Sequence, residues 1–265
     1  MKRYLMLLLI LLFFIPSLAC GSVSVPAGLV EGSGNIVTQT VDVSGFDRVT
    51  LEGFGDVYLE QGQSERLSVQ TDDNLLSLLD IKVRGKELRI GIKPGFDVSP
   101  SESITYNLIV KDLHSVSLAG SGNFYMEPVK SSDLIVSVLG SGDIKIKGMN
   151  TDKLSIDLNG SGNITVENVN AKTVDASLRG SGDIKLAGNA NTQFVTINGS
   201  GKYLTGSLET DKTQISLPGS ADITVWANDE LNIHISGSGN LQYYGRPAVD
   251  QNISGSGNIT SLGDK

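Results

Sequence analysis

A short unit of sequence constrains the fold of this chain more than any other feature. It is Gly-Ser-Gly, followed in most copies by Asn or Asp, and it returns about every 20 residues. The first glycines of the regular copies are Gly120, Gly140, Gly160, Gly180, Gly199, Gly219, Gly237 and Gly255. Two earlier copies, at Gly32 and Gly53, lie outside this even spacing. Repetition with a period of about 20 to 50 residues is typical of solenoid and array proteins.

Apolar residues keep fixed positions around each of these glycines. Leu154, Ile156 and Leu158 precede Gly160, and Ile164 and Val166 follow it. The same offsets hold apolar residues around Gly140 and Gly180, and polar residues alternate with them. A period of two residues is typical of a β-strand with one buried face. Each repeat therefore predicts two strands joined by a glycine-rich corner.

The predicted fold is all-β, a right-handed parallel β-helix (β-solenoid) with about 20 residues per coil. A single coil cannot bury its apolar face, but stacked coils bury it and pair each strand with the next. The right hand follows from the general preference of parallel crossovers. Glycine at the corner is expected to supply a positive φ angle, and the corner Asn or Asp to hydrogen-bond to nearby backbone.

The first 19 residues have the pattern of a secretory signal peptide. Lys2 and Arg3 are followed by an apolar run from Leu5 to Phe14 that is short for a membrane span. Cys20, the only cysteine of the chain, follows Ala19 and precedes Gly21. This arrangement resembles a bacterial lipoprotein signal, in which the cysteine is lipidated and becomes the mature N-terminus. The alternative is an ordinary cleaved signal with an incidental cysteine.

Loss of residues 1–19 removes two basic residues and no acidic one, so the formal net charge of −8 becomes −10. An acidic surface argues against nucleic acid as a partner. With one cysteine there is no disulfide, so stability is expected to come from coil stacking. The expected partner at this end is the membrane, through a lipid on Cys20, which predicts an exported protein anchored to the bacterial cell envelope.

Three segments follow the signal. Residues 20–34 are small and polar and predict a lipidated N-terminus and tether. Residues 35–265 predict one solenoid, with irregular first coils and a cap over 35–113 and regular coils over 114–265. Within the cap, Asp73 to Leu79 is expected to form one helical turn opened by an Asp or Asn cap, and Lys93 to Ser103 an exposed loop.

The chain resembles a known family over nearly everything from Asn35 onward. The stretch from Ser44 to Ile90, with Gly45-Phe46, Gly55-Asp56 and Asp73-Asn74-Leu75-Leu76, carries the resemblance together with the serial GSGD and GSGN units. It is similar to the autotransporter adhesin head GIN domain. The resemblance implies a β-solenoid protein of the bacterial envelope, often a lipoprotein, with no established activity and no catalytic residues to carry over.

The corner Asn and Asp residues are expected to stack in a column, which raises the question of a calcium ladder. The column consists of Asn123, Asp143, Asn163, Asp183, Asp222, Asn240 and Asn258. Calcium-binding β-helix turns recur every nine residues, and Ca²⁺ prefers several carboxylates, whereas most of these positions are neutral Asn. A structural ladder without metal or cofactor is therefore favoured. The corner serines are interpreted as hydrogen-bonding residues rather than nucleophiles; they are Ser121, Ser141, Ser161, Ser181, Ser220, Ser238 and Ser256.

A polysaccharide-acting β-helix enzyme is the alternative function. Such a site needs clustered acids and a base on one face. His114 and His234 are predicted to lie about six coils apart, and His114 falls at an inward-facing position, six residues before Gly120. Asp72 and Asp73 are adjacent, but a helix-capping role in the cap is simpler. No catalytic residues are predicted.

The favoured function is a non-catalytic, adhesin-like binding or scaffold module of the cell surface. Long, flat polar faces suit an extended glycan or a surface protein as ligand. Trp226, Tyr243 and Tyr244 form the one aromatic group considered as a contact patch. Tyr243 is at an inward-facing position, so a role in the core and end-cap is favoured for this group.

Overall fold

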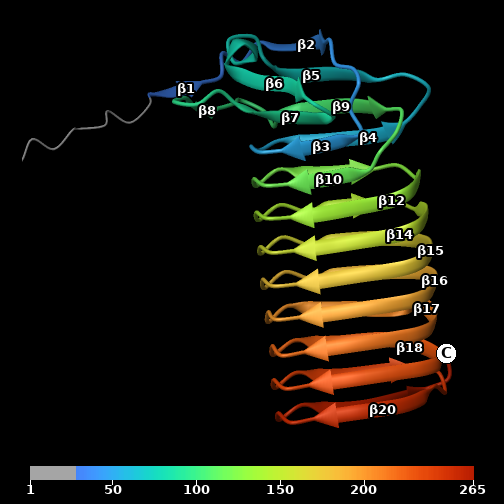
Figure 1. Cartoon of the computed structure of the whole chain (residues 1–265). Coiled ribbons are helices and arrows are strands. Elements are labelled where there is room, and N and C mark those ends of the chain that lie inside the picture. Colours follow the sequence, from blue (N-terminus) through green and yellow to red (C-terminus); the bar gives the residue numbers. More distant parts are fainter. Residues whose placement is uncertain (1–27) are drawn as a thin grey trace, which may run out of the picture.

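The computed structural model describes residues 28–265, which form a stack of β-coils with a β-rich cap at its N-terminal end (Figure 1). The predicted signal peptide and Cys20 lie outside the described residues. A 3-10 turn, η1 (Leu76–Leu78), is the one helical element in the described part of the chain. No helix between residues 28 and 265 has the length and apolar character needed to cross a bilayer.

The cap and the first layer beneath it contain nine strands, which are β1 (Leu29–Glu31), β2 (Ile36–Val41), β3 (Arg48–Leu51), β4 (Asp56–Gln61), β5 (Arg66–Asp72), β6 (Leu79–Arg84), β7 (Glu87–Ile92), β8 (Asp97–Ser99) and β9 (Thr105–Val110). The regular coils contain β10 (Ser115–Leu118), β11 (Asn123–Met126), β12 (Val129–Val138), β13 (Ile144–Ile146), β14 (Met149–Leu158), β15 (Ile164–Leu178), β16 (Ile184–Ile197), β17 (Lys202–Leu217), β18 (Asp222–Ile235), β19 (Asn240–Tyr244), β20 (Ala248–Ile253) and β21 (Asn258–Gly263).

The regular coils stack in parallel and in register. Val136 of β12 pairs with Ile156 of β14, which pairs with Ala176 of β15, so each layer advances by 20 residues. The predicted inward residues of this coil are buried; they are Leu154, Ile156, Leu158, Ile164 and Val166. The prediction of an all-β parallel solenoid with about 20 residues per coil is confirmed. Burial of the same apolar positions in layer after layer forms one continuous core along the stack.

The corner glycines are needed for a different reason from the one predicted. None of the GSG glycines in the regular coils has a positive φ angle. Instead, a Cβ atom built on Gly160 would lie 2.1 Å from the carbonyl oxygen of Gly140 in the preceding coil. The backbone N–H of Ser161 donates to that same oxygen at 3.1 Å. The explanation by positive φ is therefore wrong: glycine is required because successive corners stack backbone against backbone.

The cap begins where the purely parallel strand pairing of the regular coils gives way to a mixture of parallel and antiparallel pairs. β3 and β4 pair in parallel with β10 and β11, which places the early copy at Gly53 directly against Gly120. On their other side, β7 pairs with β3 and β9 with β4, again in parallel. Beyond that layer the pairing is antiparallel, β6 with β7, and β5 with both β9 and β2. These strands cover edges that an open solenoid would expose.

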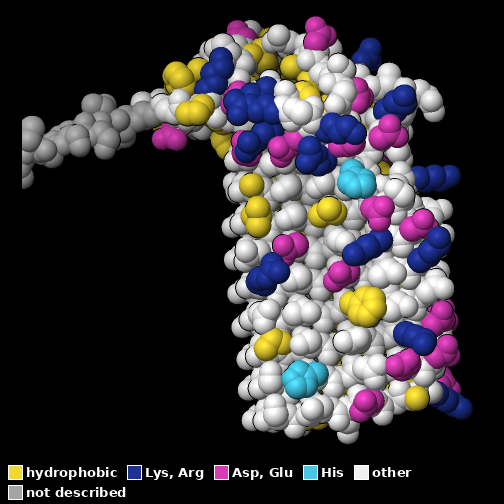
Figure 2. Space-filling model, viewed as in Figure 1, with side chains coloured by type: hydrophobic (Ala, Val, Ile, Leu, Met, Phe, Trp, Pro, Cys, Tyr) yellow, Lys and Arg dark blue, Asp and Glu magenta, His cyan; other side chains and the backbone are white. Residues whose placement is uncertain are grey.

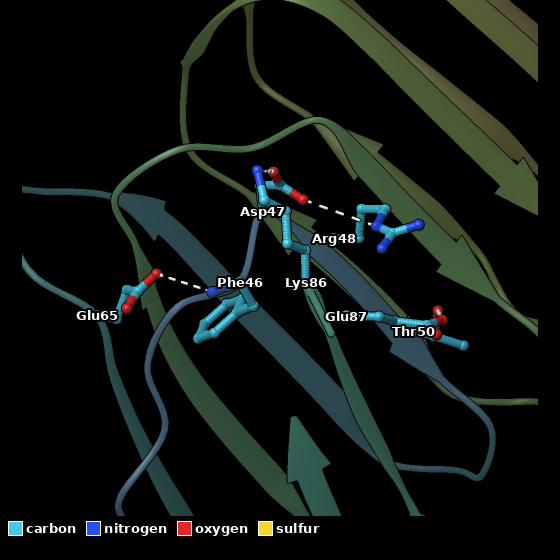
Figure 3. A network of polar contacts seen from close by, with 7 residues as sticks. All are labelled: Phe46, Asp47, Arg48, Thr50, Glu65, Lys86 and Glu87. Atoms are coloured by element: carbon cyan, nitrogen blue, oxygen red, sulfur yellow. Dashed lines mark hydrogen bonds and ion pairs between the residues drawn. The ribbon is translucent and has the colours of Figure 1, made fainter. Parts of the chain in front are cut away.

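A network of polar contacts fastens the cap to the layer formed by β3 (Figure 3). The Glu65 carboxylate accepts hydrogen bonds from the backbone N–H groups of Gly45 at 2.7 Å and Phe46 at 3.3 Å. The Phe46 ring is buried, with 3% of its surface exposed. The Thr50 hydroxyl donates to Glu87 at 2.6 Å, which links β3 to β7. Charged contacts at the solvent-exposed rim add little stability, so the buried ring and the backbone bonds hold the junction.

Two segments expected to be irregular contain a short sheet. β1, within the predicted tether, pairs in parallel with β8, within the predicted loop from Lys93 to Ser103. In addition, the Gly32 N–H donates to the Ser99 carbonyl at 2.9 Å. The chain is therefore ordered from Leu29 onward and attaches to the cap rather than to the coils.

Charged side chains are not spread evenly over the molecule. On the face shown in Figure 2, Lys, Arg, Asp and Glu side chains gather over the cap, while the coils present mainly uncharged polar side chains and backbone. Because each strand alternates inward apolar with outward polar residues, this coil face is flat and polar along its length.

Candidate functional site

The corner Asn and Asp residues form a hydrogen-bonded ladder in two runs, which Lys202 separates at the corner between Asp183 and Asp222. The Asp143 N–H donates to the Asn123 side-chain oxygen, and the Asn163 N–H to the Asp143 carboxylate, both at 3.0 Å. The ladder continues from Asp183 to the Lys202 N–H, and it also runs from Asp222 to Asn240. These side-chain oxygens are thus occupied by donors of the neighbouring coil, as a structural ladder requires.

No cluster of three or more potential metal-ligating side chains (His, Cys, Asp or Glu) occurs among residues 28–265. The corner serines are exposed, and it is their backbone N–H groups that bond to the preceding coil, as at Ser141 and Ser161.

The two histidines lie far apart. His114 precedes β10 and His234 is in β18, and the strand pairing from β10 through β12, β14, β15, β16 and β17 to β18 takes six steps. At about 4.8 Å per step the separation is about 29 Å. Both side chains are exposed, so the inward position predicted for His114 is wrong; the neighbouring Leu113 is buried instead. The two imidazoles cannot act on one substrate bond.

Asp72 and Asp73 do not cap a helix. The residue at the start of η1 is Leu75, and no side chain bonds to that end of the turn. Asp72, which is fully buried, instead accepts hydrogen bonds from the Gly34 N–H at 2.7 Å and from the Ser101 hydroxyl at 2.6 Å. Asp73 accepts from the Ser33 hydroxyl and the Asn35 amide. The predicted capping role is wrong: these carboxylates hold the early Gly-Ser-Gly-Asn copy at residues 32–35.

The aromatic group near the C-terminus is partly covered. Tyr243 is partly buried against the core. The Lys265 ammonium lies over the Trp226 ring at 5.3 Å and over the Tyr244 ring at 5.1 Å, both measured to the ring centroid. The Trp226 indole N–H is taken by Asn228 at 3.0 Å. This arrangement agrees with the interpretation as core and end-cap.

A groove of about 600 Å³ lies where the cap meets the first coils. Strands β5 and β9 of the cap and strands β4, β11, β13 and β15 of the coils contribute its lining. Their outward residues form two parallel rows. The first row, defined by the register of the strands, is Ser68, Asn107, Tyr58, Tyr125 and Lys145. The second row is Arg66, Ile109, Glu60, Glu127, Lys147 and Glu167.

The centre of the first row is an aromatic stack. The rings of Tyr58 and Tyr125 are nearly parallel, at 19°, with centroids 5.1 Å apart. The Lys145 ammonium lies 5.7 Å from the Tyr125 ring centroid, on the neighbouring strand. Tyr58 is 47% exposed, so much of its ring is open to solvent in the groove. Burial raises the pKa of Tyr125, so its phenol stays protonated and can donate a hydrogen bond.

The second row carries charges of both signs. The Glu127 carboxylate pairs with the Lys147 ammonium at 2.5 Å, and this contact raises the pKa of Lys147. The groove as a whole is lined by three basic and three acidic side chains, so its formal charge is zero. That neutrality contrasts with the acidic chain as a whole.

The pattern of the regular coils does not predict this groove, but the sequence contains a signal for it. Tyr58 and Tyr125 each follow a marker glycine, Gly53 or Gly120, by five residues. They therefore hold the same outward position in two coils. The coils are adjacent in the stack, but 67 residues separate the paired positions along the chain, and this insertion concealed the pair.

A family model described as "Putative auto-transporter adhesin, head GIN domain" matches residues 45–168 and 136–247. The chain belongs to this family. The two matches overlap and together cover most of the coils and the cap, so the head GIN resemblance seen in the sequence is confirmed. Membership in an adhesin-like family indicates a surface or extracellular protein. No curated protein matches the chain significantly.

Solved structures share the fold of this chain over nearly all of its described residues. A protein of Parabacteroides distasonis ATCC 8503, named a putative lipid binding protein, is 28% identical, with a TM-score of 0.84 over 89% of this chain and 100% of its own. A putative adhesin of the same organism is 24% identical, with a TM-score of 0.84 over 89% and 100%. A putative adhesin of Parabacteroides merdae ATCC 43184 is 23% identical, with a TM-score of 0.79 over 88% and 99%.

Proposed function

We propose that this protein is a lipid-anchored, exported binding module of the bacterial cell envelope, adhesin-like and non-catalytic, whose ligand is held in the groove between cap and coils. The single observation that carries the proposal is the exposed Tyr58–Tyr125 stack at the centre of that groove. Binding sites combine an apolar or aromatic floor with a few placed polar groups, and the two rows of the groove have this composition.

The anchor is part of the same proposal. A lipid on Cys20 would attach the mature chain to the membrane. The described chain begins beside β1, which pairs with β8 in the cap. The short distance along the chain from Cys20 to Leu29 then directs the cap toward the membrane and the last coils away from it.

The enzyme alternative has less support. General acid catalysis needs a carboxyl group that stays protonated near neutral pH. In the groove, the Glu127 carboxylate is already engaged in an ion pair with the Lys147 ammonium. The histidines lie six strand steps apart, as described above. A stacked aromatic floor supports binding without requiring any of these groups to react.

A lipid ligand is suggested by the name of one relative. The groove of this chain does not favour it, because six charged side chains line the groove. An acyl chain placed there would remove these charged groups from water and offer them no hydrogen bond in return, which is costly. An adhesin-like role fits this lining better.

The function is tested in cells that express the full chain. Wild type is expected in the membrane fraction and accessible to added protease, whereas Cys20→Ser is expected in the soluble fraction. Cells carrying the wild-type protein are expected to adhere to polysaccharide-coated or protein-coated surfaces better than cells lacking it. Persistence of Cys20→Ser in the detergent-dependent fraction would refute the anchor, and equal adhesion of the two cell types would refute the adhesin-like role. Release of reducing sugars from a polysaccharide would favour the enzyme.

A further inference from the structure

We infer that the groove binds an uncharged glycan, with one pyranose ring packed on the free face of Tyr58 and its hydroxyls bonded to Asn107 and Ser68. The inference rests on the proposed function, because it names the ligand class of that binding site. It follows from the order of side chains along the first row and from the charge of the second.

The stack leaves one aromatic face open. Tyr125 lies between Tyr58 and Lys145, so one face of its ring meets the other tyrosine and Lys145 lies over the ring from the neighbouring strand. Tyr58 shares one face with Tyr125, and its other face is directed along the row toward β9. The next outward side chains there are the much shorter Asn107 and Ser68. The drop in side-chain length beside Tyr58 leaves room for one ring against it.

The groups around this space match a sugar ring. A pyranose has a face of C–H groups, which packs on an aromatic ring, and an edge of hydroxyls, which both donate and accept hydrogen bonds. The Asn107 amide and the Ser68 hydroxyl can each donate and accept. An apolar ligand in the same place would leave these polar groups without partners, at a cost that disfavours it. The aromatic face and the amide together select a polyhydroxylated ring.

The charge of the lining selects an uncharged sugar. Arg66, Lys145 and Lys147 are balanced by Glu60, Glu127 and Glu167. Two of these six, Glu127 and Lys147, already form an ion pair with each other. An acidic polymer would meet no net attraction in the groove and net repulsion from the rest of the acidic chain. Binding of the uncharged ligand is therefore expected to be insensitive to salt.

The test uses the mature chain carrying Cys20→Ser, so that it is soluble. Binding is measured on an array of gluco-, galacto- and manno-oligosaccharides beside uronic acid oligosaccharides, and the strongest ligand is titrated by calorimetry at low and high salt. We expect an uncharged oligosaccharide to bind, with an affinity that changes less than about twofold with salt.

Three variants locate the site. Tyr58→Ala is expected to lower the affinity about tenfold, because it removes the stacking surface. Tyr58→Phe keeps that surface and is expected to bind like wild type, while Asn107→Ala is expected to weaken binding. The matched control is Phe194→Ala on β16, which removes an aromatic side chain of similar exposure, 42%, outside the groove. Its affinity is expected to be unchanged. Circular dichroism confirms that each variant is folded.

The inference is overturned if no uncharged glycan binds, if uronic acid oligomers bind better and lose affinity with salt, or if Tyr58→Ala binds as well as wild type. Phospholipid vesicles that compete with the oligosaccharide would assign the groove to a lipid instead. Adhesion of cells to surfaces that persists in Tyr58→Ala would leave the adhesin-like function standing while removing this site from it. If cells that lack the protein adhere less well although the purified protein binds no glycan, the adhesin-like function likewise stands and the glycan site is overturned.

Discussion

Replacing one corner glycine by alanine tests the physical reason for the repeat. In Gly160→Ala the new methyl group would lie 2.1 Å from the Gly140 carbonyl oxygen and 3.1 Å from its carbonyl carbon. Both atoms belong to the backbone of the preceding coil, so no side chain can rotate away to relieve the contact. Real contacts of this kind are well above 3 Å, and the two coils must therefore separate locally or shift in register.

The expected cost is that of an overpacked core. Such insertions destabilise proteins by about 1–3 kcal/mol. For a chain of this size each kcal/mol lowers the melting temperature by about 2–4 °C. We therefore expect the melting temperature of Gly160→Ala to fall by roughly 2–12 °C. The hydrogen bond from the Ser161 N–H to the Gly140 carbonyl is expected to be weakened at the same time.

Gly148→Ala is the matched control. Its new methyl group would lie 3.5 Å from the nearest atom, the Asn168 carbonyl oxygen, which is an ordinary contact. Neither Gly148 nor Gly160 has a positive φ angle, so alanine is not strained by the backbone at either position. A glycine-to-alanine change at such a site stabilises by about 0.4–1 kcal/mol through the unfolded chain. Gly148→Ala is therefore expected to melt at or slightly above the wild-type temperature.

Gly160→Asn separates the steric explanation from the one based on positive φ. Asparagine tolerates a left-handed backbone better than alanine does. If the corner needed that conformation, Gly160→Asn would be the more stable of the two variants. Steric conflict between coils predicts the reverse, since asparagine is larger. Thermal melts by circular dichroism decide the matter, and equal stability of Gly160→Ala and Gly148→Ala would refute the argument from close stacking.

Three further predictions concern the coil, its core and the cap. Deletion of residues 151–170 removes one whole coil, because its ends are equivalent in the register of the stack, and it is expected to leave a soluble β-rich protein. Deletion of residues 151–160 removes half a coil and is expected to give insoluble protein. The opposite order of damage would show that 20 residues are not one coil. The Tyr203 hydroxyl donates to the buried Gln193 side chain at 2.8 Å, so Tyr203→Phe is expected to cost about 1–3 kcal/mol in urea unfolding, and a cost near zero would contradict this. A hydrogen bond from the Ser101 hydroxyl is the main cause that holds the pKa of Asp72 below its ordinary value of 3.8. The ionised Asp72 carboxylate therefore stabilises the folded protein above pH 3.8, and this stabilisation is lost as the pH falls through the lower pKa of the folded state. Melts from pH 7 to pH 2.5 are expected to show a steeper loss for wild type than for Asp72→Asn, and parallel curves would refute the assignment.

Much of the coil could be predicted from the sequence because its determinants are local. The alternation of Leu154, Ile156 and Leu158 identifies strands and their buried face, and the 20-residue spacing identifies the coil. The ladder at Asn123, Asp143 and their equivalents follows from stacking identical corners. In each case the information lies within one repeat and is copied to the next, so strand geometry alone converts it into structure.

The sequence predicts a residue's role wrongly where that role is set by a neighbouring layer of the structure. The requirement for glycine at Gly160 is set by the carbonyl of Gly140, in the coil before it. The sequence neighbours of Asp72 predict a helix-capping role, but its hydrogen-bond partners are Gly34 and Ser101. Counting six residues back from Gly120 predicts an inward position for His114. The chain enters the regular coils from the cap just before this residue, so the count does not apply there.

Only the tertiary structure decided which layers meet at the cap. β3 and β4 stack on β10 and β11 across an insertion that forms β5 to β9, and the insertion folds back in antiparallel pairs onto the same stack. Local patterning cannot specify this, because any strand with alternating polarity can pair with any other of its kind. The groove depends on that choice. Tyr58 and Tyr125 become neighbours only because two coils 67 residues apart in the chain lie one strand spacing apart in space.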